Sequence, residues 1–243
     1  MSRGSEASGG SAGSSGSVDD ATIDFSESQD DEELVLVGRE SQLAQLEQAR
    51  QDMLATGKPV LAWISGLSGE GKSSLCEKFL QPLREGSEML VLSGRCYDRE
   101  SVPFKAVDCI VESLVRYVRS RHGKWLESEQ PEDVEFLAAI FPLFRRVDWI
   151  AKRPIHNLSR IEPQKIRGRA FYGLRQLLTA IATRTPVVMQ LDDLQWGDAD
   201  SARAWQELLV HDEAPPLLVL GSYRSDESED SPFLQTWKQL EQS

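Results

Sequence analysis

Eight consecutive residues, Gly66 to Ser73, combine glycines, a lysine and a serine in the spacing G-x-x-x-x-G-K-S. Glycines allow a loop to bend so tightly that its backbone N–H groups surround a phosphate, and the lysine neutralises phosphate charge. The serine after the lysine can ligate a magnesium ion. The spacing therefore predicts a loop that binds the phosphates of a nucleotide, with an ordinary glycine turn as the alternative.

The segments on either side of this loop support the phosphate-binding interpretation. Residues 59–65 are mostly apolar and are typical of a buried strand, whereas residues 73–80 are typical of a helix. A strand, a glycine-rich loop and a helix in this order form a P-loop, in which backbone N–H groups from Leu67 to Ser73 hold the β and γ phosphates beside the helix dipole. The predicted nucleotide-binding residues of the loop are Gly66, Leu67, Ser68, Gly69, Glu70, Gly71, Lys72, Ser73 and Ser74.

A second group of suitable side chains follows another apolar run, residues 186–191. Asp192 and Asp193 come at the carboxyl end of this predicted strand, which is where ligands bind in open α/β sheets. Parallel strands would bring that end beside the P-loop, so Ser73 and Asp192 are predicted to hold Mg²⁺. Asp193 is predicted to polarise an attacking water, and its short side chain predicts slow turnover. The alternative is that the two aspartates only cap a loop.

Arg224 ends a further predicted strand, residues 216–224. If this strand lies between the P-loop strand and the strand that ends at Asp192, the Arg224 guanidinium points at the γ-phosphate and senses it or stabilises its charge. The alternative for Arg224 is a surface ion pair with Asp226 or Glu227. The predicted catalytic residues are Lys72, Asp193 and Arg224.

The hydrophobic pattern predicts the elements that position these groups. Apolar residues at helical spacing predict helices before, between and after the strands. The predicted strands are residues 59–65, 89–94, 186–191 and 216–224. Strands that alternate with helices favour an α/β fold of the P-loop NTPase type, a three-layer α/β/α sandwich around a mostly parallel sheet. The stretch 124–160, which several prolines interrupt, is expected to form a helical insertion over one edge of the sheet.

Bulk composition limits the classes of protein that the chain can represent. It has 243 residues, of which 40% are hydrophobic and 27% are charged, enough for one sizeable domain. No apolar run approaches the roughly 20 residues of a membrane helix, and no signal-peptide pattern occurs, so we expect a cytoplasmic protein with no membrane partner. The three cysteines and three histidines show no metal-binding spacing.

Negative charge is concentrated near the N-terminus. Residues 18–33 contain eight acidic residues and no Lys or Arg, in a chain of net charge −12. Residues 1–33 are rich in Ser, Gly and acid, and we predict a disordered tail there, with an acidic recognition tail as the alternative. The predicted domain, residues 34–243, is only mildly acidic and lacks the basic face that nucleic-acid binding needs, so no direct nucleic-acid binding is expected.

Several segments together resemble one family. Val37-Gly38-Arg39-Glu40 is similar to the G-R-E segment that opens AAA-type P-loop ATPase domains of the Orc1-like group. Residues 191–198 resemble the D-D-L-H-W-A-D segment of STAND signal-transduction ATPases. Residues 94–104 and 221–227 are similar to the versions fused behind bacterial serine/threonine protein kinases.

The resemblance carries implications for ligands, partners and topology. It implies ATP rather than GTP, with Val37 and Arg39 near the adenine and ribose. It also implies a switch in which ATP or ADP determines whether neighbouring domains are released, so we expect protein partners or fused effector and kinase domains outside this chain. Family members have the strand order 5-1-4-3-2, and the chain is expected to stop before the fifth strand, as a domain incomplete at its C-terminus.

The sequence thus predicts a regulatory ATPase module that binds Mg-ATP and hydrolyses it slowly, as a signalling switch within a larger kinase or transcription-regulator system. The alternative is a nucleotide-gated protein-interaction module, or a truncated remnant, without significant hydrolysis. A P-loop kinase for a small molecule is disfavoured by the paired aspartates at the strand end and by the segment around Trp196 that follows them.

Overall fold

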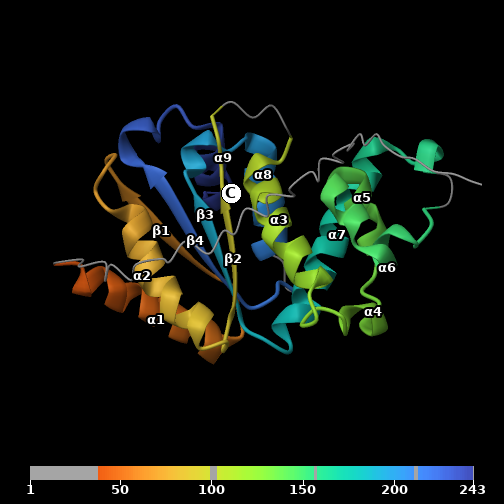
Figure 1. The fold of residues 1–243 in the computed structure, drawn as a ribbon. Coiled ribbons are helices and arrows are strands. Elements are labelled where there is room, and N and C mark those ends of the chain that lie inside the picture. The colour runs from red at the N-terminus through yellow and green to blue at the C-terminus, as the bar shows by residue number, and fades with distance from the viewer. Residues whose placement is uncertain (1–37, 99–102, 156–157, 211–212, 243) are drawn as a thin grey trace, which may run out of the picture. The chain divides into compact units, whose positions relative to one another are not determined.

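The computed structural model describes residues 38–98, 103–155, 158–210 and 213–242. Four parallel strands within them form one sheet in the order β1-β4-β3-β2 (Figure 1). The strands are β1 (Val60–Gly66), β2 (Leu90–Arg95), β3 (Val187–Asp192) and β4 (Leu217–Arg224). Because β4 lies between β1 and β3, the condition that placed Arg224 beside the P-loop is met.

Helices connect the strands, as parallel pairing requires. The α-helices are α1 (Glu40–Thr56), α2 (Lys72–Glu85), α3 (Lys105–Arg119), α4 (Leu126–Glu129), α5 (Leu137–Ile140), α6 (Asp148–Ala151), α7 (Pro163–Ala182), α8 (Ala199–Leu209) and α9 (Pro232–Glu241). Short 3₁₀ turns are η1 (Val134–Phe136), η2 (Pro142–Arg146), η3 (Leu158–Arg160), η4 (Leu194–Trp196) and η5 (Ser225–Glu227).

Alternate side chains of each strand contact different helical layers. In β3, Val188 belongs to a buried cluster with α1 and α2, whereas Val187 and Met189 belong to a larger cluster with α3 and α8. Both faces of the strand are therefore buried, which explains why its sequence is a continuous apolar run rather than an alternating one. The predicted parallel α/β sheet with helices on both faces is confirmed.

Helix ends follow local sequence signals. α1 stops at Gly57, whose left-handed conformation (φ 63°) lets its N–H bond to the Met53 carbonyl. α9 starts at Ser231, whose side chain accepts a hydrogen bond from the Leu234 N–H, with Pro232 in the first turn. Both ends agree with the sequence prediction, and α9 packs against α8 and η4 beside the sheet.

The insertion at 124–160 differs from the expectation of a cover over the sheet edge. It consists of short helical turns, and Pro142 separates α5 from η2. These turns pack mainly on helices, η1 and α5 on α7 and η2 on α3, and Figure 1 shows α5 beside α7. The Phe141 ring contacts those of Phe104 and Phe171 edge to face, at centroid distances of 6.3 and 6.1 Å, and the latter two are 5.0 Å apart. The aromatic residues of the insertion therefore extend the helical layer.

Two predictions fall on residues that the structure does not describe. The tail at 1–33 and the nucleoside contact of Val37 both lie outside the described residues. Within the described part of the chain, no helix has both the length and the apolar character needed to cross a membrane.

Candidate functional site

The P-loop turns sharply between β1 and α2. Gly69 and Gly71 have φ angles of 80° and 78°, a region in which residues with side chains are strained. Lys72 is the first residue of α2, and its Nζ donates to the carbonyl oxygens of Gly66 and Leu67 at 2.9 and 2.8 Å. The ammonium group and the positive end of the helix dipole are thus held together, and this arrangement favours an anion.

A cavity of about 300 Å³ adjoins the P-loop, and charged side chains from three other strand ends line it. Arg95 comes from the end of β2, Asp193 follows β3, and Arg224 ends β4. The P-loop contributes Ser68, Gly69, Gly71, Lys72, Ser73 and Ser74. The three predicted catalytic residues therefore face one space, which we call the phosphate cavity. Arg95 was not predicted.

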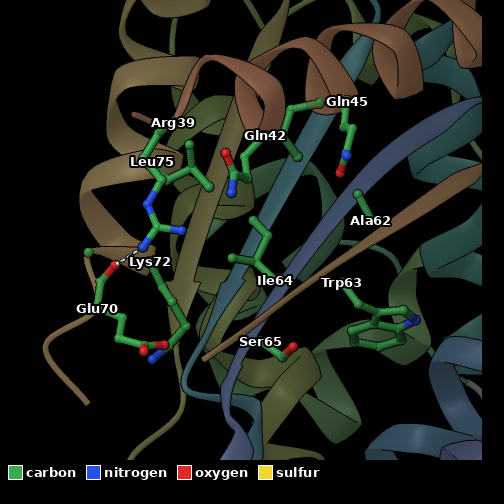
Figure 2. Close-up of a pocket in the computed structure, with 12 residues that line it drawn as sticks. Arg39, Gln42, Gln45, Ala62, Trp63, Ile64, Ser65, Glu70, Lys72 and Leu75 are labelled. Atoms are coloured by element: carbon green, nitrogen blue, oxygen red, sulfur yellow. Dashed lines mark hydrogen bonds between the residues drawn. The ribbon is translucent and has the colours of Figure 1, made fainter. Parts of the chain in front are cut away.

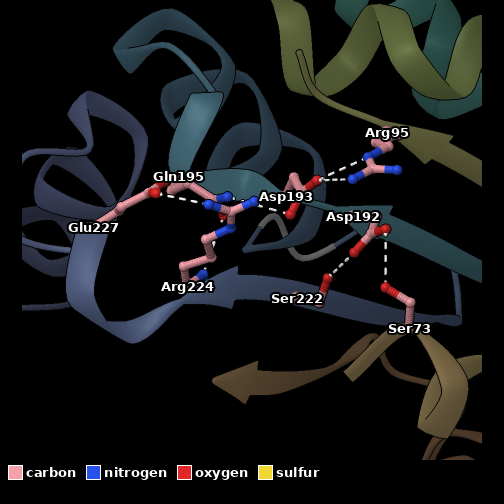
Figure 3. A network of polar contacts seen from close by, with 8 residues as sticks. All are labelled: Ser73, Arg95, Asp192, Asp193, Gln195, Ser222, Arg224 and Glu227. Carbon is pink, nitrogen blue, oxygen red and sulfur yellow. Dashed lines mark hydrogen bonds and ion pairs between the residues drawn. The ribbon is translucent and has the colours of Figure 1, made fainter. Parts of the chain in front are cut away.

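Asp192 lies beside Ser73 at the base of this site (Figure 3). The Ser73 hydroxyl is 3.4 Å from Asp192 Oδ2, and Asp192 Oδ1 accepts a short hydrogen bond from the Ser222 hydroxyl. A hydroxyl and a carboxylate oxygen are the hard ligands that Mg²⁺ prefers, so this pair fits the ion. The described residues contain no cluster of three or more His, Cys, Asp and Glu side chains suited to a metal. A magnesium ion here would therefore depend on phosphate oxygens as well.

The Asp193 carboxylate is fixed on both of its oxygens (Figure 3). Arg95 donates to Oδ2 through two guanidinium nitrogens, at 2.7 and 2.6 Å, and Gln195 donates to Oδ1 at 3.2 Å. The residue is only 8% exposed and has a left-handed backbone (φ 56°), which Asp tolerates better than most residues. The hydrogen bond to Asp193 raises the pKa of Arg95. The geometry places a buried, ion-paired carboxylate at the cavity.

Arg224 lies at the cavity and also forms the ion pair with Glu227 that was the alternative, while its contact with a γ-phosphate stays a prediction. It lines the phosphate cavity, and its guanidinium also donates to Glu227 at 2.9 Å. The Arg224 N–H donates to the Gln195 Oε1 atom at 3.1 Å, so Gln195 links the backbone of β4 to Asp193. Gln195 was missed because it lies in the turn η4, which the hydrophobic pattern does not reveal.

Glu70 holds the P-loop in shape from within. Its Oε2 accepts the Leu67 N–H at 2.7 Å, and it lies so close to Gly66 that a Cβ there would be 2.5 Å away. Arg39 donates to the Glu70 carbonyl oxygen at 2.8 Å, which ties the start of α1 to the loop. The P-loop residues that line the phosphate cavity begin at Ser68, and Gly66, Leu67 and Glu70 of the predicted set are not among its lining residues.

A second cavity, of about 350 Å³, adjoins the P-loop between α1 and β1 (Figure 2). It shares Gly71 and Lys72 with the phosphate cavity, and Arg39 lines it near Glu70. The contact of Arg39 with a nucleoside stays a prediction, and the structure shows only that Arg39 lines this cavity. We call this space the α1–β1 cavity.

A buried thiol lies below the site in α2. Burial raises the pKa of the Cys76 thiol to about 12, and the nearby Asp192 carboxylate contributes in the same direction. The side chain belongs to the apolar cluster of α1 and α2. Cys76 is thus an uncharged core residue rather than a nucleophile.

Comparison with known protein families identifies the type of domain. The model of the AAA ATPase domain matches residues 35–220. The chain belongs to this family. The matched span covers the P-loop, both aspartates and the start of β4, and ends four residues before Arg224. Membership indicates nucleotide binding at the P-loop of this AAA ATPase domain. A comparison with curated proteins finds no match.

Proposed function

We propose that this domain binds Mg-ATP and hydrolyses it slowly to ADP and phosphate. The observation that carries the proposal is the phosphate cavity, in which Lys72 of the P-loop shares one space with Asp193 and Arg224 from two other strand ends. Cationic side chains suited to a triphosphate and a carboxylate suited to an attacking water thus line one space of about 300 Å³.

The side chains divide the work by their chemistry. Backbone N–H groups of the P-loop and Lys72 bind the phosphates, and Ser73 with Asp192 would hold Mg²⁺, which neutralises charge on the β and γ phosphates when bound. Asp193 accepts the proton of the water that attacks the γ-phosphorus, while ADP leaves. Arg224, helped by Arg95, stabilises the negative charge that develops on the transferred phosphoryl group.

Slow turnover follows from the surroundings of Asp193. Both carboxylate oxygens already accept hydrogen bonds, from Arg95 and Gln195. An attacking water can therefore donate to Asp193 only after one of these hydrogen bonds is displaced. We infer a molecular switch whose ATP state persists, with protein partners or fused kinase or effector domains reading that state. The resemblance to Orc1-like and STAND ATPases supports this inference.

Binding and phosphate release, measured on the same samples, test the proposal. We expect the parent protein to bind ATP in the presence of Mg²⁺ by isothermal titration calorimetry and to release phosphate slowly. Lys72→Ala should lose ATP binding because it removes the ammonium group at the loop. Lys58→Ala, a change at an exposed lysine before β1, is the matched control and should bind as the parent does. Tight ATP binding by Lys72→Ala would contradict the proposal.

The same hydrogen bonds favour a second candidate function, a nucleotide-gated interaction module without significant hydrolysis. If Arg95 never releases Asp193, the domain binds ATP and signals through occupancy alone. ATP binding without phosphate release, in a sample with a sharp thermal transition, would select this alternative.

A further inference from the structure

Gln195 contacts two of the residues that line the phosphate cavity, Asp193 and Arg224 (Figure 3). It is only 3% exposed. Its carboxamide nitrogen donates to Asp193 Oδ1 at 3.2 Å, and its carboxamide oxygen accepts the Arg224 backbone N–H at 3.1 Å. The reverse orientation of the amide would place two acceptors together at Asp193 and two donors together at Arg224, so only this orientation satisfies both partners.

The backbone around Gln195 holds its side chain in this place. Asp193 has a left-handed conformation (φ 56°), and the Trp196 N–H closes the following turn by donating to the Asp193 carbonyl at 3.0 Å. β4 pairs with β3 as far as Gly221, but with β1 as far as Arg224. Beyond Gly221, the Gln195 carboxamide therefore links the end of β4 to the residue that follows β3.

The two hydrogen-bond donors of the Asp193 carboxylate differ in strength. Arg95 is charged and donates to Oδ2 through two nitrogens, at 2.7 and 2.6 Å. Gln195 is neutral and donates to Oδ1 through one nitrogen at 3.2 Å. Two short bonds between ions are stronger than one longer bond from a neutral amide. The hydrogen bond at Oδ1 is therefore the one that an attacking water displaces.

We propose that Gln195 restrains hydrolysis by occupying the Asp193 oxygen that receives the proton of the attacking water. The proposal rests on the proposed function. Once the water replaces the amide, its oxygen bonds to the γ-phosphorus, the bond from that phosphorus to the ADP oxygen breaks, and the proton goes to Oδ1. Arg95 stays on Oδ2, so hydrolysis by this route does not need Arg95 to release Asp193. Gln195 is a positioning residue, because it acts through Asp193.

The test removes the amide and measures rate and affinity separately. Gln195→Met keeps the length of the side chain but has no N–H donor. Under saturating Mg-ATP, phosphate release should become about tenfold faster, which corresponds to the displacement of one hydrogen bond to a charged group. The affinity for Mg-ATP, measured by calorimetry, should stay within about threefold. A purely structural role predicts the opposite sign, because a displaced Asp193 or Arg224 slows the reaction.

Two controls show whether the effect passes through Asp193. Gln206→Met makes the same change at a partly buried glutamine of α8, which donates to the Leu240 carbonyl at 3.4 Å, and it should leave the rate as in the parent. In an Asp193→Asn background, Gln195→Met should change the single-turnover rate less than twofold, because the base that Gln195 restrains is absent. An equal acceleration in that background would overturn the inference.

A second variant guards against a failure of the first to fold. Gln195→Leu also lacks the donor and should accelerate phosphate release in the same way. Loss of the cooperative thermal transition in both variants would assign Gln195 a structural role and overturn the inference.

The remaining outcomes separate this inference from the proposed function. If the parent hydrolyses ATP and Gln195→Met is equally fast or slower, the inference alone is overturned. If the parent binds ATP without releasing phosphate and Gln195→Met releases it, the restraint is supported. If neither protein releases phosphate, or if the parent does not bind ATP, the proposed hydrolysis is overturned and the inference with it.

Discussion

At the scale of single residues, Asp193 determines whether the site hydrolyses ATP or only binds it. Asp193→Asn keeps the size of the side chain but removes the charge that accepts a proton and pairs with Arg95. We expect ATP affinity to stay within about threefold and phosphate release to fall about 10²-fold or more, the usual contribution of a general base. Phosphate release under saturating Mg-ATP is the measurement.

The matched control for this change is Asp200→Asn. Asp200 lies in the first turn of α8, where its carboxylate is half exposed and pairs with Arg203. The same chemical change there should leave both ATP affinity and turnover as in the parent. If Asp193→Asn also releases phosphate at the parental rate, Asp193 is not the base, and the water is activated by another group.

A second prediction at this scale concerns the Cys76 thiol. Burial raises its pKa from 9.0 to about 12, so the thiolate is almost absent at pH 8. We expect no alkylation of Cys76 by iodoacetamide at pH 8 in the folded protein and full alkylation in urea, by peptide mass spectrometry. Because the folded state holds this proton more tightly than the unfolded state, the stability it contributes is complete below about pH 9 and is lost as the pH rises through about 12. Rapid labelling of Cys76 in the folded protein would contradict the burial of its thiol in the core.

At the scale of elements, the close approach of β2 and α3 supports the site. A Cβ on Gly94 would lie 2.2 Å from the backbone carbonyl oxygen of Cys109. The backbone of β2 or of α3 would have to move to remove this clash. We expect Gly94→Ala to lower the free energy of unfolding by about 2–3 kcal/mol in urea denaturation, the usual cost of overpacking. The change also displaces the end of β2, where Arg95 holds Asp193, so phosphate release should change as well.

Gly168→Ala provides the contrast. Gly168 lies inside α7, and beyond its own stretch of helix no described residue comes within 4 Å of the Cβ position. The same substitution there should raise the free energy of unfolding by about 0.5–1 kcal/mol, because alanine has the higher helix propensity. Equal effects at both glycines would show that the contact between Gly94 and Cys109 does not limit stability.

The elements also show what sequence patterns can and cannot predict. The four strands and the long helices α1, α3 and α7 were predictable because their apolar periodicity extends over many residues. The insertion was predicted less well, because its turns are four residues or fewer in most cases and its packing on α7 depends on contacts distant in sequence.

In the site too, residues with a local sequence signature were predictable, whereas pairings of residues distant in sequence were not. The P-loop and Asp192 carry local signatures, so their proximity followed from a parallel sheet alone. The pairing of Arg95 with Asp193 joins residues 98 positions apart and depends on β2 lying next to β3. Arg95 directly follows a predicted strand. Because the carboxyl ends of parallel strands meet at one edge of the sheet, its position in the sequence could have predicted that it lies at the site.

At the scale of the whole domain, the P-loop strand depends on few neighbours. Among the described strands, β1 pairs only with β4, and α1 and α2 cover one of its faces. A ligand that contacts the P-loop, β3 and β4 together therefore adds contacts between the edge strand β1 and the strands beside it. Nucleotide binding should consequently stabilise the domain as a unit, and not only order the loop.

We expect Mg-ATP at about 100 times its dissociation constant to raise the free energy of unfolding by about 2.7 kcal/mol, which for a domain of this size corresponds to roughly 5–10 °C in melting temperature. Adding EDTA should remove most of this shift, because Ser73 and Asp192 can contribute to phosphate binding only through a cation. Differential scanning calorimetry of the parent and of Lys72→Ala, each with and without Mg-ATP, measures the effect. A shift of equal size in Lys72→Ala, or one that EDTA leaves intact, would place the stabilising nucleotide elsewhere than on the P-loop.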